Sequence, residues 1–339
     1  MSDARPVVVI GAGLAGLTCA RQLAAEGESV LVLDKGRSPG GRLATRRIGQ
    51  AVVDHGAQFF TVREAEFASM VTSWQRAGLV YEWSRGFTEP ADGHPRYAVR
   101  WGMNALAKHL AAGIALRVGV EVTSIRVADD GDGFVVEVDG DERSAGRDAV
   151  PTRSWSVQAK SVVLTSPVPQ SLELLDRGSV QLPSADEAAL RSIRYSPTIA
   201  ALIVLDGLSA IEMPGGIQID DPESPIVWIA DNLVKGVSTV PALTVHASGS
   251  WSVEHYDEDE DKTLAQLIEF SAHHFGGSRI VEAQLKQWRY SVPDSVQDQR
   301  VRDVTIAAGR LLFAGDAFGG PRIEGAALSG AAAARVLLA

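Results

Sequence analysis

The sequence of 339 residues contains a single cysteine, Cys19. One thiol cannot form an internal disulfide, a dithiol redox pair or a thiolate cluster for zinc, so these classes of protein are excluded. Basic residues are also few, with 32 Lys and Arg against 42 Asp and Glu. Nucleic-acid binding needs clustered Lys and Arg to neutralise phosphates, so we do not expect nucleic acid as the main partner.

Long apolar runs are missing as well. The first apolar run follows MSDARP and is interrupted by Arg21, so we predict neither a signal peptide nor a membrane span. We therefore expect a cytoplasmic location and no membrane partner. The acidic run Asp257–Lys262 is interpreted as a solvated turn or helix start, and no metal site is predicted. With 45% hydrophobic and 22% charged residues, the chain is typical of a globular protein with a large core.

The strongest motif lies within the first 34 residues. A β-branched run, Val7–Ile10, predicts a buried parallel strand, and a second strand is expected at Ser29–Leu33, closed by Asp34. Between them the chain carries G-x-G-x-x-G, formed by Gly11, Gly13 and Gly16. In this setting the glycines permit a tight turn, the approach of a pyrophosphate and close helix–strand packing, while the acid bonds to ribose hydroxyls. The sequence therefore predicts a dinucleotide-binding unit.

The identity of the dinucleotide depends on the next stretch. An acid at position 34 favours a ribose without a phosphate, as in FAD or NAD. KGRSPGGRLATRR then places Gly40 and Gly41 before Arg42, which suits a second contact with a pyrophosphate; a solvated basic loop is the alternative. No second G-x-G-x-x-G occurs, although an enzyme with its own NADPH domain would be expected to carry one.

These N-terminal residues resemble the flavin-dependent amine oxidase superfamily, in which a C-terminal strand ending in Gly-Asp completes the flavin site. LLFAGDAF, with Gly315 and Asp316, matches that segment. The resemblance implies that Asp316 bonds to the ribityl chain or near the pyrophosphate. It also implies that a helix expected from Gly325 directs its N-terminal amides at the flavin pyrimidine ring. Taken alone, Asp316 would be interpreted as a helix N-cap.

The resemblance implies an α/β fold with a Rossmann-type, glutathione-reductase-like FAD-binding domain and a second, mixed-sheet α+β substrate domain. The predicted FAD-binding domain comprises residues 1–60, 97–167 and 303–339, and the substrate domain comprises residues 61–96 and 168–302. The implied FAD contacts are Gly11, Gly13, Leu14, Ala15, Gly16, Asp34, Lys35, Gly41, Arg42, Gln58, Phe59, Val122, Thr165, Gly315, Asp316, Ile323, Glu324 and Ala327.

Further elements are predicted from periodicity. A helix over Glu64–Gly78 carries apolar residues at helical spacing, which we interpret as core. Strands are expected over Val135–Val138 and Ala159–Leu164, with a loop or hairpin over Asp139–Trp155 between them.

Several stretches narrow the resemblance to renalases and their bacterial relatives. They are DHGAQFFT, SPVPQSLELL, WIADN, VHAS and LKQWRYS, in this order along the chain. Such proteins are FAD oxidases that convert mis-reduced NAD(P)H isomers, with hydride on ring carbon 2 or 6, to NAD(P)+ and reduce O2 to H2O2. The resemblance thus implies a dihydronicotinamide dinucleotide and O2 as partners. The residues it places at the reaction are Gln58, Phe60, Trp228, His246 and Trp288.

A dihydropyridine becomes aromatic when it loses hydride, so this chemistry needs a well-placed flat ring and no strong base. Trp228 and Trp288 are expected to wall the pocket, with burial in the core as the alternative. His246 is interpreted as a wall or structural residue and not as an acid or base. Arg63 and Arg289 are expected either to hold substrate phosphates or to pair with surface acids.

Three functions stay open: a renalase-type oxidase, a flavin amine oxidase or phytoene-type desaturase, and a flavoprotein without catalytic activity. Covalent flavin in amine oxidases uses a C-terminal Cys, which this chain lacks, so we predict non-covalent FAD. Amine oxidases also place two aromatic residues before the flavin. Tyr290 follows Trp288 so closely that we do not expect this pair on one strand face. A desaturase would need a long apolar tunnel, and no stretch indicates one.

Overall fold

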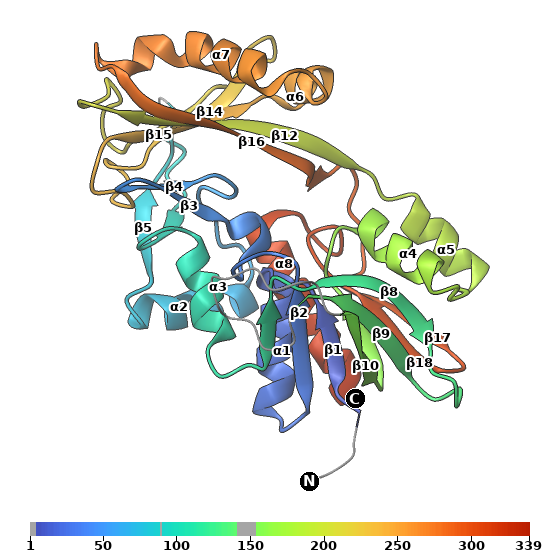
Figure 1. Cartoon of the computed structure of the whole chain (residues 1–339). Helices are drawn as coiled ribbons and strands as arrows, with labels where there is room; N and C mark the ends of the chain where they lie inside the picture. Colours follow the sequence, from blue (N-terminus) through green and yellow to red (C-terminus); the bar gives the residue numbers. More distant parts are fainter. Residues whose placement is uncertain (1–4, 89, 141–153) are drawn as a thin grey trace. The chain divides into compact units, whose positions relative to one another are not determined.

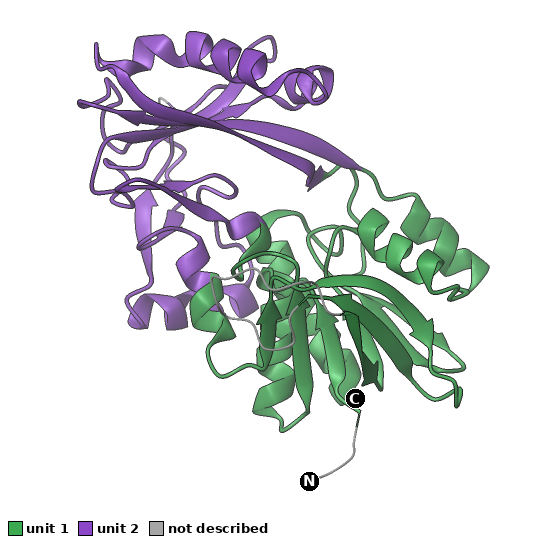
Figure 2. Ribbon diagram, in the orientation of Figure 1, with its two compact units in different colours: residues 1–41, 107–194, 293–339 green, residues 42–106, 195–292 purple. Residues whose placement is uncertain are grey.

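The computed structural model describes residues 5–88, 90–140 and 154–339. These residues form two compact units (Figure 2). Unit 1 comprises residues 1–41, 107–194 and 293–339, and unit 2 comprises residues 42–106 and 195–292. Unit 1 therefore joins the two ends of the chain. The predicted boundaries of the FAD-binding and substrate domains group residues by function and stay a prediction.

The main sheet of unit 1 has six strands in the order β17-β18-β11-β1-β2-β7 (Figure 1). Neighbouring strands are parallel, except that β17 runs antiparallel to β18. The strands are β1 (Val7–Ile10), β2 (Val30–Asp34), β7 (Leu116–Val118), β11 (Ser161–Leu164), β17 (Arg302–Ile306) and β18 (Gly309–Phe313). Every residue of β1 and β11 is buried, as expected for central parallel strands. The predicted strand at Val7–Ile10 is confirmed.

Two helices of unit 1, α1 (Leu14–Ala25) and α8 (Arg322–Leu338), pack directly against each other. A Cβ atom on Gly330 of α8 would lie only 2.1 Å from the carbonyl oxygen of Ala15 in α1, so the two backbones touch. The alanine-rich sequence of α8 permits this approach. The prediction that the helix begins at Gly325 was wrong: α8 begins at Arg322, directly after its N-cap Pro321.

A second sheet of unit 1 contains three antiparallel strands in the order β10-β9-β8. Its strands are β8 (Glu121–Val127), β9 (Phe134–Asp139) and β10 (Ser154–Ala159), and the remaining helices of the unit are α4 (Val168–Arg177) and α5 (Ser184–Arg191). The single strand predicted over Ala159–Leu164 was wrong. Ala159 pairs with Phe134 in the antiparallel sheet, whereas Ser161 pairs with Val7 in the parallel sheet. The chain changes sheets at this point.

The predicted loop or hairpin over Asp139–Trp155 lies mostly outside the described residues. Its two ends are strand, because Asp139 closes β9 and Trp155 belongs to β10. Two short elements contain residues of both units: η1 (Gly41–Leu43) and α3 (Asn104–Ala111).

Unit 2 is built on a five-stranded sheet in the order β13-β14-β15-β12-β16. The strands are β12 (Tyr195–Leu205), β13 (Gly216–Gln218), β14 (Ile226–Asp231), β15 (Ala242–Ala247) and β16 (Ile280–Pro293). Two helices, α6 (Gly249–His255) and α7 (Glu260–Ser271), lie along one face, followed by η2 (Ala272–Phe275) (Figure 1). Odd-numbered residues of β12 from Ile199 to Leu205 point into the core on this helical face.

The opposite face of the sheet packs against the hairpin of β3 (Thr45–Ile48) and β4 (Ala51–Asp54), through Leu202 and Val204 of β12. A second hairpin consists of β5 (Val80–Ser84) and β6 (Arg96–Val99). The helix predicted over Glu64–Gly78 is confirmed as α2 (Ala65–Arg76), with Phe67 and Trp74 buried. The predicted fold class, a Rossmann-type α/β unit with a second α+β unit, is confirmed.

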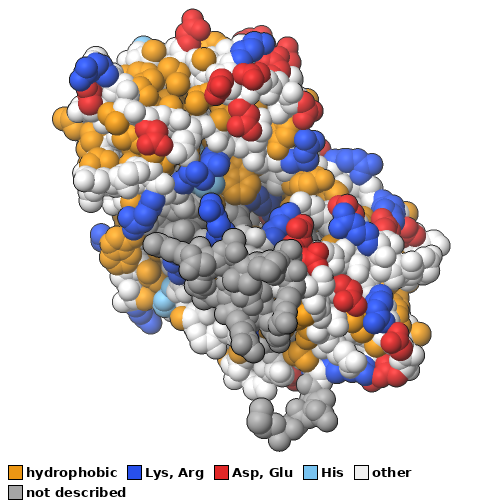
Figure 3. All heavy atoms as spheres, in the orientation of Figure 1, with side chains coloured by type: hydrophobic (Ala, Val, Ile, Leu, Met, Phe, Trp, Pro, Cys, Tyr) orange, Lys and Arg blue, Asp and Glu red, His pale blue; other side chains and the backbone are white. Residues whose placement is uncertain are grey.

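The face drawn in Figure 3 carries acidic and basic side chains interspersed with apolar ones. Surface ion pairs of the described residues include those of Arg191 with Asp176 and Glu187 on α4 and α5. Within the described ranges, no helix is long and apolar enough to cross a membrane. Nor do the described His, Cys, Asp and Glu residues gather into a group of three or more that could hold a metal ion.

Candidate functional site

At two positions of the turn between β1 and α1 in unit 1, the backbone itself requires glycine. Gly11 has a φ of +106°, and a Cβ atom on Gly16 would lie 2.0 Å from the carbonyl oxygen of Gly11. The hydroxyl of Thr165, just after β11, donates to the carbonyl oxygens of Ile10 and Gly11 at 2.9 and 3.1 Å. The predicted residue Thr165 therefore closes this turn.

Gly13 is different, because nothing in the chain requires glycine there. Its backbone is extended, with φ −77° and ψ −178°, and a Cβ atom would meet no atom within 4 Å. Gly13 is also the N-cap of α1, and no side chain caps the helix. The free first-turn amides, with the predicted residues Leu14 and Ala15 among them, can face an anion that approaches the backbone. The turn thus fits a pyrophosphate.

Asp34 ends β2 and is fixed beside this turn. Its two carboxylate oxygens accept hydrogen bonds from the backbone amides of Ala12 and Gly36, each at 2.6 Å. Burial raises the pKa of Asp34, while these two hydrogen bonds oppose the rise. A carboxylate has further lone pairs, so Asp34 can still accept from ribose hydroxyls. The exposed Lys35 follows it.

The predicted glycine pair also lies at the turn. The amide of Gly40 donates to the carbonyl oxygen of Ala12 at 2.9 Å, and Gly41 lies beside the Cα atom of Gly13. Val122, the predicted adenine neighbour, is buried in β8, and two residues earlier the amide of Val120 donates to the carbonyl oxygen of Asp34 at 3.2 Å. The N-terminal cofactor residues of unit 1 are therefore gathered around one turn.

The C-terminal residues reach the same place through β18, the neighbour of β11. A Cβ atom on Gly315 would lie 3.9 Å from the carbonyl oxygen of Thr165, and the Gly315 amide donates to the hydroxyl of Ser329 in α8 at 2.8 Å. Asp316 follows and is buried. The predicted residues Ile323, Glu324 and Ala327 lie in the first two turns of α8, which no side chain caps. The two ends of the chain thus meet in unit 1.

Arg42 has other partners than the predicted pyrophosphate. Its guanidinium donates to the carbonyl oxygen of Ser291 at 2.8 Å and lies 6.0 Å from the ring centroid of Tyr195. Both partners belong to the five-stranded sheet of unit 2. Protein groups therefore hold this side chain, and the contacts give no support to the predicted phosphate role.

In unit 2, the sheet face opposite α6 and α7 carries the predicted substrate residues. Trp228 of β14 and His246 of β15 are cross-strand partners, and Ala200 of β12 pairs with His246. Cross-strand partners share a face of the sheet. The ring of Trp228, which is 6% exposed, lies 5.3 Å from Phe59 and 4.8 Å from Phe87, measured between centroids. Trp228, Phe59 and Phe87 therefore form a wall of aromatic rings.

The segment after β4, residues 54–58, lies over this face. The Gln58 side-chain amide donates to the carbonyl oxygen of Asp54 at 2.7 Å, and the hydroxyl of Thr244 in β15 donates to the same oxygen at 2.7 Å. The indole of Trp288 in β16 donates to the carbonyl oxygen of His55 at 3.1 Å. The Trp288 and His55 rings are stacked with centroids 5.3 Å apart. The predicted residues Gln58, His246 and Trp288 therefore share one surface.

Both histidines of this surface are weak bases. Burial lowers the pKa of His55 to about 4, helped by the positive charge of Lys286. Burial also lowers the pKa of His246 to about 4, although a hydrogen bond to the His55 backbone opposes the shift. Both imidazoles are therefore neutral near pH 7, which agrees with the interpretation of His246 as a wall residue.

A buried ion pair fixes Asp54, the first residue of the segment 54–58. The Lys235 ammonium lies 2.9 Å from the Asp54 carboxylate, and both side chains are fully buried. Asp54 also accepts from the Thr45 hydroxyl at 2.6 Å and from the Met103 amide at 2.8 Å. Burial lowers the pKa of Lys235, and Asp54 opposes this. The carboxylate is engaged by three donors and is not placed as a base.

Four buried polar atoms of this surface have no hydrogen-bond partner among the described residues: Trp228 Nε1, Gln58 Oε1, His246 Nε2 and His55 Nδ1. Buried polar groups in proteins are nearly always paired with protein groups, ordered water or a ligand, so these four atoms are available for hydrogen bonds to a bound group.

Phe60 does not belong to this surface. Its ring is 4% exposed and packs among Phe67, Trp74 and Tyr97, with centroids 5.7 to 6.4 Å away. Neighbouring residues in extended chain point in opposite directions, so Phe59 faces Trp228 while Phe60 faces the core beside α2. The predicted catalytic place of Phe60 is corrected to a core position.

Two expectations about β16 also change. Residues two apart on a strand point to the same face, so the argument that spacing separates Trp288 from Tyr290 was wrong. Tyr290 packs edge-on against Tyr195, with centroids 5.9 Å apart. Arg289 points to the helical face instead, where it pairs with Asp257 at 3.2 Å and lies over Tyr256. The alternative of a surface ion pair therefore applies to Arg289, while Arg63 is exposed.

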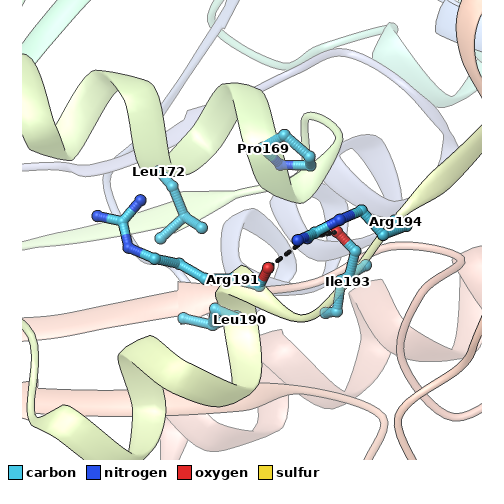
Figure 4. Close-up of a pocket in the computed structure, with 6 residues that line it drawn as sticks. All are labelled: Pro169, Leu172, Leu190, Arg191, Ile193 and Arg194. Carbon is cyan, nitrogen blue, oxygen red and sulfur yellow. Dashed lines mark hydrogen bonds between the residues drawn. The ribbon is translucent and has the colours of Figure 1, made fainter.

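A surface pocket of about 300 Å³ lies in unit 1 at α4 and α5 (Figure 4). The Arg194 guanidinium there donates to the backbone carbonyl oxygens of Arg191 and Ile193. The residues that line the pocket are Pro169, Leu172, Leu190, Arg191, Ile193 and Arg194. None of the predicted site residues lines this pocket, so it is not the candidate site.

The sequence analysis missed the Asp54–Lys235 pair and the role of His55. The dipeptide Asp54-His55 after a β-branched strand is a local signal for a polar site. Lys235 gives no such signal, because its partner is 181 residues away.

The chain matches two family descriptions. Residues 9–74 match an NAD(P)-binding Rossmann-like domain, and residues 76–338 match the family of flavin containing amine oxidoreductases. Among curated proteins, the chain is similar to hydroxyneurosporene desaturase of Rubrivivax gelatinosus, with 49% identity over 57 residues, 17% of this chain. It is also similar to lysine-specific histone demethylase 1 homolog 3 of Arabidopsis thaliana, with 48% identity over 68 residues, 20% of this chain. The matches span only 11% and 4% of these two relatives.

Solved structures show the same fold over the whole chain. A candidate protoporphyrinogen oxidase of Exiguobacterium sp. 255-15 has a TM-score of 0.71 with 12% identity and covers 99% of both chains. A cofactor-binding variant of putrescine oxidase also has a TM-score of 0.71, with 15% identity over 98% of both chains.

The second family description covers most of the chain, and the turn at Gly13, the acid Asp34 and the C-terminal Gly315–Asp316 segment fit FAD. The protein therefore belongs to the flavin containing amine oxidoreductase family.

Proposed function

We propose that the protein is an FAD-dependent oxidase of the renalase type. Its substrate is a mis-reduced NAD(P)H isomer, a 2- or 6-dihydropyridine, which it returns to NAD(P)+ while O2 becomes H2O2. The observation that carries this proposal is the surface of unit 2 formed by Gln58, Trp228, His246 and Trp288. It offers flat aromatic rings and neutral imidazoles, and its carboxylate, Asp54, is fully engaged.

This surface suits a substrate that needs no base. A dihydropyridine that gives up a hydride becomes a pyridinium, and no proton has to leave the ring. The chain must hold the ring flat, orient it and exclude water. Trp288, braced by the stacked His55, is proposed as the flat wall for the ring. With a pKa of about 4, His246 stays uncharged beside it.

The cofactor role falls to unit 1. When bound, FAD supplies a two-electron acceptor that takes the hydride and passes the electrons to O2. The substrate leaves as NAD(P)+, and O2 with both electrons and two protons leaves as H2O2. Gly13 and the first turn of α1 are proposed to hold the pyrophosphate, Asp34 the adenosine ribose and Asp316 the ribityl chain. The predicted split into FAD-binding and substrate domains is part of this proposal.

Amine oxidation is the second candidate. It is favoured by the finding that Trp288 and Tyr290 share one face of β16, because two aromatic rings on one face can flank an amine. Against it, the nearby polar atoms include an unpaired indole donor, Trp228 Nε1, which an alkylammonium cannot satisfy.

Anaerobic mixing of the purified flavoprotein with single substrates separates the candidates. We expect fast flavin bleaching by 2- or 6-dihydro-NAD(P), and slow or no bleaching by primary amines, polyamines and ordinary NADPH. On admission of O2, one H2O2 should form for each dihydropyridine consumed. Bleaching by amines alone would overturn the proposal in favour of the second candidate. Flavin that no dihydropyridine isomer reduces would also overturn it.

A further inference from the structure

We infer that Gln58, Trp228 and His246 form a recognition site for a primary carboxamide, the group that nicotinamide carries on its ring. The inference rests on the proposed function and names the substrate group that the protein selects. It is drawn from the hydrogen-bonding capacity that these three side chains leave unused.

Each residue offers one defined atom. The Trp228 indole can only donate, and its buried N–H has no protein partner. The amide nitrogen of Gln58 already donates to the carbonyl oxygens of Asp54 and Gly56, so the unpaired Oε1 is an acceptor. His246 is bonded to the backbone of His55, which leaves Nε2 of the neutral ring as an acceptor. These three atoms therefore consist of one donor and two acceptors; the fourth unpaired atom of the surface, His55 Nδ1, belongs to the ring that stacks on Trp288 and is not counted in the set.

The three side chains lie together on one surface. Trp228 and His246 are direct cross-strand partners on the sheet face away from α6 and α7. Thr244 shares that face with His246, because the two are two residues apart on β15. The Thr244 hydroxyl and the Gln58 amide bond to the same oxygen, that of Asp54, which places Gln58 next to this part of β15.

A primary carboxamide is the complement of this set, because it has two N–H donors and one carbonyl acceptor. A carboxylate has no donor and would face two acceptors. A ketone satisfies Trp228 but leaves both acceptors unpaired, and an alkylammonium leaves Trp228 unpaired. Leaving a buried polar group without its partner is costly, so a site of this kind rejects analogues strongly. The set thus selects the amide over its isosteres.

The neighbouring contacts hold the set rigid. Asp54, which accepts from Thr45, Met103 and Lys235, anchors the segment that carries Gln58. Gly56 within the segment has no room for a side chain, since a Cβ atom would lie 2.0 Å from the carbonyl oxygen of Arg42. Fixed donors and acceptors lose little entropy on binding, which favours selectivity.

The test compares three dihydropyridine substrates with the holoenzyme: 6-dihydro-NAD (or the 2-dihydro isomer if that one is used), and its analogues with an acetyl or a carboxylate group in place of the carboxamide. We expect kcat/KM for flavin reduction to fall about 100-fold for the acetyl analogue and further for the carboxylate. A second readout is the affinity for the products, NAD+ against nicotinic acid adenine dinucleotide, from the perturbed flavin absorbance.

Two variants test which side chains bond to the carboxamide. Gln58→Leu should lower kcat/KM for the carboxamide substrate about 10-fold and leave the acetyl analogue unchanged, because only the amide needs an acceptor. Trp228→Phe keeps an aromatic ring but removes the N–H, so both substrates should lose about 10-fold alike. Gln266→Leu and Trp251→Phe are matched controls. The Oε1 atom of Gln266 in α7 is also buried and unpaired, and Trp251 packs on the helical side of the sheet. Flavin content and circular dichroism establish that each variant is folded.

The outcomes separate the two proposals. If no dihydropyridine reduces the flavin, the proposed function fails and this inference fails with it. If the dihydropyridine is oxidised but all three ring substituents react alike, the carboxamide site is wrong and the proposed function stands. The carboxamide site is also wrong if Gln58→Leu lowers the acetyl and carboxamide rates equally, or if Gln266→Leu has the effect expected of Gln58→Leu.

Discussion

The two units differ in how their proposed functional regions are built. In unit 1 the proposed cofactor region is made by leaving side chains out: Cβ atoms on Gly16, Gly325 and Gly330 would lie 1.7 to 2.1 Å from backbone carbonyl oxygens. In unit 2 the surface is made by side chains that fill space: the Trp288 and His55 rings are stacked, the Trp288 indole donates to the carbonyl oxygen of His55, and Trp228 packs against Phe59. The contacts of Gly16 with Gly11 and of Gly325 with Gly320 are local in the chain, whereas the contact of Gly330 with Ala15 and the side-chain surface of unit 2 need partners from distant elements. The comparison predicts which changes each unit tolerates.

The largest effect is expected in unit 1, from Gly16→Ala. The new Cβ atom cannot avoid the backbone oxygen of Gly11, so we expect about 5 kcal/mol of lost stability and no bound FAD. Gly13→Ala is the matched variant, since its Cβ atom meets nothing. It should change stability by less than about 1 kcal/mol and yet lose FAD affinity at least tenfold. Urea unfolding and the flavin-to-protein absorbance ratio measure both. A Gly13→Ala protein with full FAD content would contradict the pyrophosphate contact.

In unit 2, the ion pair of Asp54 and Lys235 should give the next largest loss. Lys235→Met leaves a buried carboxylate without its cation, and we expect a loss of about 3 to 5 kcal/mol. Adding Asp54→Asn removes the stranded charge and should restore part of this stability. Urea unfolding of the single and double variants forms the measurement. If the double variant were no more stable than Lys235→Met, the pair would not be coupled as described.

Because His55 and His246 are buried in the neutral form, we expect the free energy of unfolding to fall in acid. Their folded pKa values of about 4 lie below the ordinary 6.5, so their contribution to stability is complete above pH 6.5 and is lost as the pH falls toward 4. Between pH 7 and pH 5 each should cost about 2 kcal/mol of unfolding free energy. His246→Gln should flatten this pH dependence, while the exposed His109→Gln should not. Equal slopes in both variants would refute the assignment.

The smallest of these effects is expected from Asp316→Ala. Asp316 follows a buried strand whose end is already fixed by the bond from Gly315 to Ser329, so the fold should lose only about 1 kcal/mol. FAD retention should fall about tenfold, because the acid is proposed to bond to the ribityl chain. Equilibrium dialysis against apoprotein measures the affinity. Unchanged FAD affinity would show that Asp316 serves the protein alone.

The predictions made from the sequence succeeded where a signal was short-range. The turn at Gly11–Gly16, the acid Asp34 and the helix with Phe67 and Trp74 follow from spacings of a few residues, and each lies where it was predicted. Errors arose where direction mattered. Phe60 was assigned to the reaction, but the alternation of extended chain turns it into the core. The phosphate contact of Arg42 stays a prediction, and the contacts of its guanidinium with Ser291 and Tyr195 give it no support.

By itself, the sequence determined the dinucleotide turn, because glycine spacing and a β-branched strand specify a local backbone path, to which Thr165 adds two hydrogen bonds. Only the tertiary structure decided the surface of unit 2. Trp228 and His246 become partners through the register of two strands, and Asp54 meets Lys235 across 181 residues. Burial then sets the charge of each group, and burial is a property of the packed sheet and not of any short stretch of residues.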